Sequence, residues 1–177
     1  LDIDGTGEHD IVTPVPFLSH MLTQIARHGS FDLAVHATGD TEIDDHHTVE
    51  DVGLCLGAAF KAALGDRKGL ERFGDRMAPL DEALVQVVID LSGRPYLMYA
   101  LELPKAKLGT FDVELVKEFY QAFSVKADAN VHVRQVTGDN LHHIIEASFK
   151  AFALALRGAT RITRSTDKLP STKEHLD

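Results

Sequence analysis

The 177-residue chain has one cysteine, Cys55, no tryptophan, and no apolar run near the roughly 20 residues that a membrane-spanning helix needs. A single cysteine excludes an intrachain disulfide and a cysteine-rich zinc site, and it suits a reducing compartment. Positive charge is also scarce, because 18 Lys and Arg stand against 27 Asp and Glu, for a formal net charge of −9. Broad binding of nucleic-acid phosphates needs clustered cations, so we expect neither a nucleic acid nor a membrane as partner. A small anion held by a few local cations fits this balance.

The length suits one domain, or two small halves that share a core. The chain begins at Leu1 rather than methionine, so we expect its natural N-terminus to lie upstream. Ten histidines are many for this length, and several of them cluster.

Two stretches carry the same grouping of histidine and glutamate. "DDHHTVED" at 44–51 and "HHIIEAS" at 142–148 each place two adjacent histidines ahead of a glutamate. Their surroundings repeat as well. A helical period (17–29 and 111–127) precedes an alternating strand pattern (31–40 and 130–139) that contains Thr-Gly-Asp, and a second helix follows (45–64 and 142–157). Residues 83–101 are rich in β-formers and are interrupted at 93–95. We therefore predict an α+β fold made of a duplicated α/β unit, with helices on one side of each sheet and a pseudo-twofold repeat.

The spacing within each motif favours metal binding. On a helix, residues i and i+4 share a face, so His46 and Glu50 point the same way, as do His142 and Glu146. The second histidine of each pair is turned about 100° away, so each helix start offers ligands in two directions. One such motif would be weak, because solvated residues at a helix start are its ordinary explanation. Two copies after the same turn favour metal ligands, and imidazole with carboxylate suits Mn²⁺, Fe²⁺, Co²⁺, Ni²⁺ or Zn²⁺.

The repeat adds two further candidates. His20 precedes His46 by 26 positions and Glu118 precedes His142 by 24, so both occupy matching places in the unit. The remaining histidines lack this support and are interpreted as structural: His9, His28, His36, His132 and His175.

Six motifs together resemble one known family. "FLSHMLTQIARHG", "DDHHTVEDVG", "RFGDRMAPLDEAL", "DLSGRPY", "HHIIEASFKAFALALR" and "PSTK" are similar, in this order and nearly end to end, to imidazoleglycerol-phosphate dehydratases of histidine biosynthesis. The resemblance implies a half-domain like the second domain of ribosomal protein S5, duplicated at about 1–85 and 86–165. A phosphate-binding tail at 166–177 would complete a single dehydratase domain. It also implies trimers that assemble into a homo-oligomeric 24-mer with interfacial active sites, in the cytoplasm, or in the plastid of a plant.

The resemblance further implies the reaction and its residues. D-erythro-imidazole glycerol phosphate would lose water to give imidazole acetol phosphate, with two Mn²⁺ per active site. Our hypothesis is that the ions favour the imidazolate form of the substrate, which expels the hydroxyl before the C2 proton is lost. The implied metal ligands are His20, His46, His47, Glu50, Glu118, His142, His143 and Glu146. The implied substrate contacts are Gln24, Arg72, Asp81, Arg94, Lys150, Ser171 and Lys173. The catalytic carboxylates would be Glu146 and Glu50.

Two departures from the family pattern and two alternatives accompany this interpretation. Many members have histidine where this chain has Glu118, and the family usually has a glutamate in a segment just before "LDIDGTG". Taken singly, Arg72 could form a surface ion pair and Lys150 could be a solvated helix residue. A hydrolase with a hydroxide bridging two metals is one alternative function. A metal-storage or metal-triggered assembly protein is the other.

Overall fold

The computed structural model describes residues 1–163, 168–172 and 176. Its elements are β1 (His9–Val12), α1 (Pro16–Gly29), β2 (Leu33–His36), α2 (His46–Leu64), β3 (Phe73–Leu80), β4 (Ala83–Asp90), β5 (Tyr96–Ala100), β6 (Lys107–Leu108), β7 (Phe111–Asp112), α3 (Leu115–Ala127), β8 (Asn130–Thr137) and α4 (Leu141–Ala159). The predicted α+β class is confirmed. The helix predicted from residue 111 begins later, at Leu115, because Phe111 and Asp112 pair with β6 in a short hairpin.

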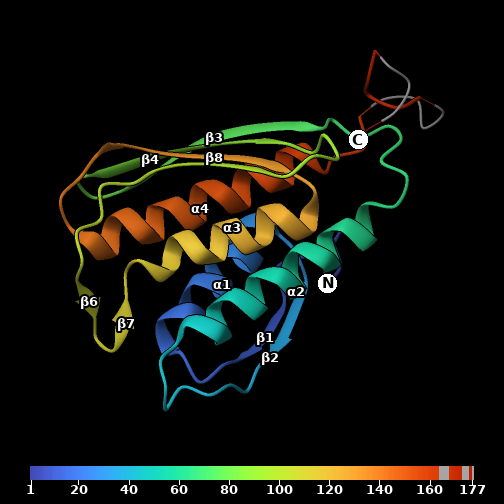
Figure 1. Ribbon diagram of the computed structural model, residues 1–177. Helices are drawn as coiled ribbons and strands as arrows, with labels where there is room; N and C mark the ends of the chain where they lie inside the picture. Colours follow the sequence, from blue (N-terminus) through green and yellow to red (C-terminus); the bar gives the residue numbers. More distant parts are fainter. Residues whose placement is uncertain (164–167, 173–175, 177) are drawn as a thin grey trace.

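The elements form layers (Figure 1). A four-stranded sheet in the order β3-β4-β8-β5 covers α4 and α3, and the small parallel sheet β1-β2 lies on the other side of the helices, next to α1 and α2. β4 pairs antiparallel with β3 and β8, whereas β5 pairs parallel with β8. The helices therefore lie between the sheets, on one face of each.

The strand pairing contains the internal repeat. β1 runs parallel to β2 as β5 runs parallel to β8, and each pair is linked through a helix, α1 or α3. Helices α2 and α4 then follow the Thr-Gly-Asp segments. Both β3 and β4 join the sheet of the second half, whereas the sequence pattern alone puts the boundary near residue 85.

The helices of the two halves pack against one another across the middle. α1 lies against α4, and α2 lies against α3, so each contact joins one helix from each half. A Cβ atom at Gly57 would lie 2.6 Å from the carbonyl oxygen of Phe123, so only glycine allows α3 to approach α2 this closely. Buried aromatic rings on α3 and α4, including Phe119, Phe123, Phe149 and Phe152, fill the space beneath the sheet, and burial of each stabilises the fold by about 1.5–3 kcal/mol.

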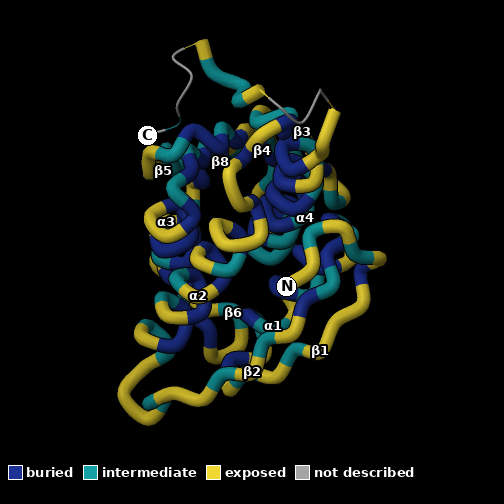
Figure 2. Tube along the Cα trace, turned by 90° about the vertical axis from the view of Figure 1, so that its right-hand side faces the viewer, coloured by how far each residue is buried: buried dark blue, intermediate teal, exposed yellow. Residues whose placement is uncertain are grey.

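Figure 2 shows the buried residues concentrated where α3 and α4 meet the large sheet. None of the described helices combines the length and the apolar character that crossing a membrane would require.

Candidate active site

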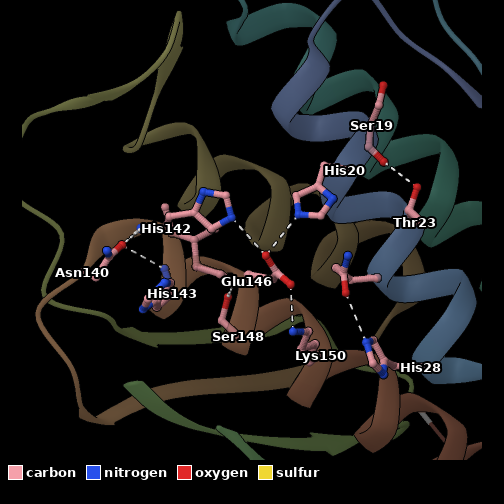
Figure 3. A network of polar contacts seen from close by, with 12 residues as sticks. Ser19, His20, Thr23, His28, Asn140, His142, His143, Glu146, Ser148 and Lys150 are labelled. Carbon is pink, nitrogen blue, oxygen red and sulfur yellow. Dashed lines mark hydrogen bonds and ion pairs between the residues drawn. The ribbon is translucent and has the colours of Figure 1, made fainter. Parts of the chain in front are cut away.

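Three predicted ligands meet where α1 crosses α4. His20 of α1 and His142 of α4 each place Nε2 at 3.0 Å from Oε2 of Glu146. Figure 3 shows both rings directed at this carboxylate. Potential ligand atoms of these three side chains all lie within 4.8 Å of one another, the one such group among the described residues. Two imidazoles and a carboxylate are a donor set that fits a divalent transition metal.

Local structure explains this convergence. The side chain of Asn140 caps α4 by accepting hydrogen bonds from the backbone N–H groups of His142 and His143, at 3.0 and 3.3 Å. His142 and Glu146 then stand one turn apart on the face that α1 covers. The Phe17 ring packs edge-on against His20 and His142, with centroids 6.4 and 5.3 Å apart, and helps to fix both imidazoles.

Lys150, one turn after Glu146 on α4, is the fourth member of the cluster. Its Nζ donates a hydrogen bond to Oε1 of Glu146 at 2.7 Å. Burial by itself raises the pKa of Glu146. The hydrogen bonds from Lys150, His20 and His142 outweigh burial and lower that pKa to about 2. Glu146 is therefore an anion at neutral pH, with one oxygen held by lysine and the other between two imidazoles.

The matching centre between α2 and α3 is more open. His46 and Glu118 line one cavity of about 380 Å³, together with Tyr99, Leu103 and residues at the start of α3. Glu50 stands one turn after His46 and is half-buried. His46 on α2 and Glu118 on α3, which belong to different halves of the duplicated unit, therefore line the same cavity at this crossing.

The second histidine of each motif faces a different carboxylate. Nδ1 of His47 lies 2.8 Å from Oδ2 of Asp40, and Nδ1 of His143 lies 2.8 Å from Oε2 of Glu82. These hydrogen bonds raise the pKa of both histidines and lower that of Asp40, and they lower the pKa of Glu82 to about 2. Figure 3 shows His143 turned away from Glu146. Each motif thus presents its histidines in two directions.

Of the predicted substrate contacts, Arg72, Arg94 and Ser171 lie elsewhere in the chain, whereas Lys150 lies at Glu146. The guanidinium of Arg72 donates to both oxygens of Asp90, at 2.7 and 3.1 Å, and to the carbonyl oxygen of Pro170 at 2.8 Å. Arg72 therefore anchors the segment that carries Ser171. Arg94 lies in the neighbouring turn after β4, and Lys173 is outside the described residues.

This phosphate end is far from the metal ligands of the same chain. The backbone N–H of Arg72 donates to the carbonyl oxygen of Ala159, the last residue of α4, whereas His142 is in the first turn. At 1.5 Å per residue, about 26 Å of helix separates them. Figure 1 shows the two ends of α4 on opposite sides of the molecule. One chain therefore keeps Arg72 and the segment with Ser171 apart from the metal ligands, whereas the predicted substrate contacts Lys150 and Asp81 lie beside Glu146 and His143.

Four other residues contact or adjoin the predicted site: Gln24, His28, Asp81 and Glu82. Oε1 of Gln24 lies 3.1 Å from Nε2 of His28, and burial and the Lys150 charge lower the pKa of His28. Sequence reasoning left His28 as structural, although its i+4 relation to Gln24 on the His20 helix was a usable signal. Asp81 is exposed, and its Oδ2 lies 3.9 Å from Nε2 of His143. The next residue, Glu82, makes the closer contact with His143, at 2.8 Å from Nδ1, and the sequence did not reveal it.

A duplicated α+β domain with histidine–carboxylate centres at the crossings of its helices is the class that fold and site define. A family model described as imidazoleglycerol-phosphate dehydratase matches residues 13–156. The chain is 57% identical over 176 residues to the imidazoleglycerol-phosphate dehydratase of Geobacter sulfurreducens, covering 99% of this chain and 90% of the relative. It is 55% identical over 178 residues to that of a Prochlorococcus marinus strain, covering 100% of this chain and 89% of that relative.

Solved structures agree with these relatives. The dehydratase from Staphylococcus aureus has a TM-score of 0.84 and 43% identity, covering 90% of this chain and 91% of that one. The enzyme from Pyrococcus furiosus, solved in complex with (S)-C348, has a TM-score of 0.84 and 37% identity, covering 96% and 91%. The chain belongs to the imidazoleglycerol-phosphate dehydratase family, which makes it a hydro-lyase of histidine biosynthesis.

Proposed function

We propose that this chain converts D-erythro-imidazole glycerol phosphate into imidazole acetol phosphate and water, with two Mn²⁺ per active site, in the cytoplasm. The observation that carries the proposal is the convergence of His20, His142 and Glu146 on one point in a member of this family. Membership in the family disfavours the hydrolase and metal-storage alternatives.

Each metal would be held by residues of both halves. His20, His142 and Glu146 would bind one ion, and His46, Glu50 and Glu118 are the corresponding ligands at the other helix crossing. His47 and His143 would supply further imidazoles in the second direction. Bound ions would act as Lewis acids toward the nitrogens of the substrate imidazole and favour its imidazolate form.

The protein must also receive the C2 proton and release the hydroxyl as water. Both oxygens of Glu146 are engaged, by two imidazoles and by Lys150. The side chain of Glu50 has no hydrogen bond to the described residues, so one of its oxygens would be available for proton transfer while the other binds metal. After these two losses the enol tautomerises to the ketone.

The substrate phosphate would be bound by another copy of the chain. Arg72, Arg94 in the turn after β4, and the segment that carries Ser171 lie near the end of α4 that is about 26 Å from His142, a span too long for a small substrate. A second copy can bring its own phosphate end to the metal ligands. Active sites between subunits follow from this separation, and they support the homo-oligomer of trimers and the 24-mer that the family resemblance implies.

Complementation between inactive chains tests this arrangement. Glu146→Gln removes a metal ligand and Arg94→Ala removes a predicted phosphate contact. Neither variant alone should dehydrate the substrate at a measurable rate once stripped of metal and reloaded with Mn²⁺. Co-assembled from equal amounts, they should recover roughly a quarter of the wild-type rate, because random mixing makes that fraction of interfaces intact.

Size-exclusion chromatography with light scattering confirms that each mixture assembles. Recovery near zero from a fully assembled mixture would show that both residues serve the same chain's site. A wild-type protein that is inactive with Mn²⁺ would overturn the proposed reaction itself.

A further inference from the structure

Both outward-facing histidines have the same ring nitrogen occupied by a carboxylate. His47 and His143 each use Nδ1, at 2.8 Å, and this leaves Nε2 as the other ring nitrogen, which in His143 has Asp81 Oδ2 at 3.9 Å, beyond hydrogen-bond distance. An imidazole that donates Nδ1–H has a lone pair on Nε2, which is the state that a metal ligand needs.

The two acids come from unrelated places in the duplicated unit. Asp40 belongs to the Thr-Gly-Asp segment just before α2, whereas Glu82 lies in the turn between β3 and β4. If the second half repeated this contact of the first half, His143 would pair with Asp139, the aspartate of its own Thr-Gly-Asp segment. Instead, Glu82 reaches across from the sheet. The same contact built from different positions indicates that the hydrogen bond, rather than the loop, is what both sites require.

A third histidine–carboxylate pair shows what an ordinary surface contact looks like here. Nε2 of His36 lies 2.8 Å from Oδ2 of Asp10, and both side chains are about two-thirds exposed. This pair is outside the His-His-x-x-Glu motifs and uses the other ring nitrogen. It therefore provides an internal control of equal length.

Asp40 and Glu82 also affect the electrostatics at the starts of α2 and α4. His47 and His143 are in the first turn of α2 and α4, where the helix dipole is positive and disfavours a cation. A carboxylate beside each ring offsets this field. Glu82 also fixes the helix start, because its Oε1 accepts the backbone N–H of Asn140 at 3.1 Å while Oε2 holds the ring.

We propose that Glu82 and Asp40 are positioning residues, which orient His143 and His47 through Nδ1 so that Nε2 of each ring is the metal-binding atom. The proposal rests on the metal-dependent function proposed above. Neither acid touches the substrate in this assignment, and each acts only through its histidine.

Titration of metal-stripped protein with Mn²⁺, followed by calorimetry, tests the assignment. Glu82→Gln keeps an oxygen for the Asn140 N–H but can present an amide N–H to Nδ1, which favours the proton on Nε2 and blocks the ligand. We expect the Mn²⁺ dissociation constant to rise about 10–100-fold, as is usual when the partner of a ligating histidine is lost. Asp40→Asn should act similarly through His47, and Asp10→Asn should change the constant less than twofold.

A double-mutant cycle separates positioning from a general loss of structure. If Glu82 acts through His143, adding Glu82→Gln to His143→Ala should cause no further weakening. The visible spectrum of the Co²⁺-loaded protein should change in Glu82→Gln and Asp40→Asn but not in Asp10→Asn.

Each other outcome overturns the proposal. Glu82→Gln with wild-type affinity would show that the acid does not set the ring, and equal weakening in the His143→Ala background would show a structural role. Wild-type protein that takes up no Mn²⁺ would sink the metal-dependent function as well, whereas normal wild-type uptake confines any failure to this inference.

Discussion

The α1–α4 crossing and the α2–α3 crossing occupy equivalent places in the duplicated unit. Among the described residues, only the candidate ligands at the α1–α4 crossing hydrogen-bond to one another. Their residues correspond in pairs: His142 with His46, Glu146 with Glu50, His20 with Glu118, and Lys150 with Leu54. At the α1–α4 crossing, the imidazoles of His20 and His142 and the ammonium of Lys150 surround the carboxylate of Glu146. Each oxygen of that carboxylate therefore has a hydrogen-bond partner.

The α2–α3 crossing offers one imidazole and two carboxylates instead. Glu118 lines the cavity beside His46, Glu50 stands one turn after His46, and Leu54 occupies the place that Lys150 holds in the other half. Under the proposed metal-dependent function, a bound cation would hold this imidazole and these two carboxylates together. Two differences, Glu118 in place of His20 and Leu54 in place of Lys150, leave this crossing without the hydrogen-bonded cluster that the described residues form at the other.

The strongest test of this difference compares Glu146→Gln with Glu50→Gln. Both should reduce the dehydration rate by more than roughly 100-fold, since losing a ligand exceeds the 10–100-fold effect of losing a ligand's partner. In metal-free protein the two should diverge. Glu146→Gln leaves Lys150 without its anion and destabilises the fold, whereas Glu50 has no ion pair among the described residues, so Glu50→Gln should change the stability little. Steady-state rates and urea unfolding measure the two effects, and equal loss of stability in both variants would contradict the comparison.

Lys150→Met probes the compensating charge alone. The ion pair with Glu146 is largely buried, with side chains 16% and 12% exposed. Removing the ammonium leaves a buried carboxylate held only by imidazoles, and we expect a loss of about 2–3 kcal/mol, below the range for fully buried pairs because some solvent reaches the site. Leu54→Met, at the matching place, should cost under about 1.5 kcal/mol. Chemical denaturation of metal-free protein provides both values, and similar losses would show that Lys150 acts by packing.

Close approach of backbones distinguishes the α2–α3 crossing in a second way. A Cβ at Gly57 would meet backbone atoms of Phe123 and Ala127 on α3 at 2.6 and 3.0 Å. Gly57→Ala should therefore destabilise the protein by about 1–2 kcal/mol, because overpacking exceeds the gain in helix propensity. Thermal unfolding measures the change, with Ala58→Gly on the exposed side of the same helix as the control for propensity. A stabilised Gly57→Ala variant would mean that α3 moves away freely.

The residues at the start of β2 and β8 have opposite hydrogen-bonding roles: the side chain of Asp32 accepts hydrogen bonds from the backbone, and that of Asn130 donates to it. Asp32 precedes β2 and accepts hydrogen bonds from the backbone N–H groups of Thr6, Gly7 and Glu8, and those from Thr6 and Glu8 do most to lower its pKa. Asn130 occupies the matching place beside β8, but its amide donates to the Arg94 carbonyl oxygen at 2.7 Å.

A carboxyl whose pKa is lowered by folding stabilises the protein above its ordinary pKa, and this stabilisation is lost as pH falls through the lowered value. Asp32→Asn should therefore reduce stability at pH 7, and its difference from wild type should shrink as pH falls below about 4. Asn130→Gln lacks an ionisable group and should show a difference that does not depend on pH. Unfolding curves of metal-free protein between pH 3 and 7 check both, and a pH-independent effect of Asp32→Asn would refute the role of its charge.

The sequence predicted the four helices, strands at 31–40 and 130–139, a β-rich stretch at 83–101 and the repeat, because strong periodicity and the duplicated motifs determine these locally, but it missed β3. It could not predict that α1 packs on α4 and α2 on α3. That pairing depends on side chains distant in the chain, such as Gly57 against Phe123, and it decides that His20 meets Glu146 rather than Glu50.

The candidate site was predicted in its residue types better than in its contacts. His142 and Glu146 share a helix face, as helical spacing requires. Glu82 was missed because its contact with His143 comes from a turn 61 residues away, and no local pattern signals it. Arg72 was expected to face phosphate, and the structure pairs it with Asp90 across a strand register that only the folded sheet sets.

The smallest difference between the halves lies just behind the paired histidines. Thr48 of α2 corresponds to Ile144 of α4, and its Oγ1 is buried without a hydrogen-bond partner among the described residues. Leaving a hydroxyl unpaired costs free energy that an isosteric apolar group avoids. Thr48→Val should therefore be neutral or stabilise the metal-free protein by up to about 1 kcal/mol, as measured by urea unfolding, with Thr23→Val as the control because that hydroxyl donates to the carbonyl oxygen of Ser19. Destabilisation by Thr48→Val as large as that by Thr23→Val would show that the hydroxyl has a partner, and that the first turns of α2 and α4 differ in their hydrogen bonding as well as in their packing.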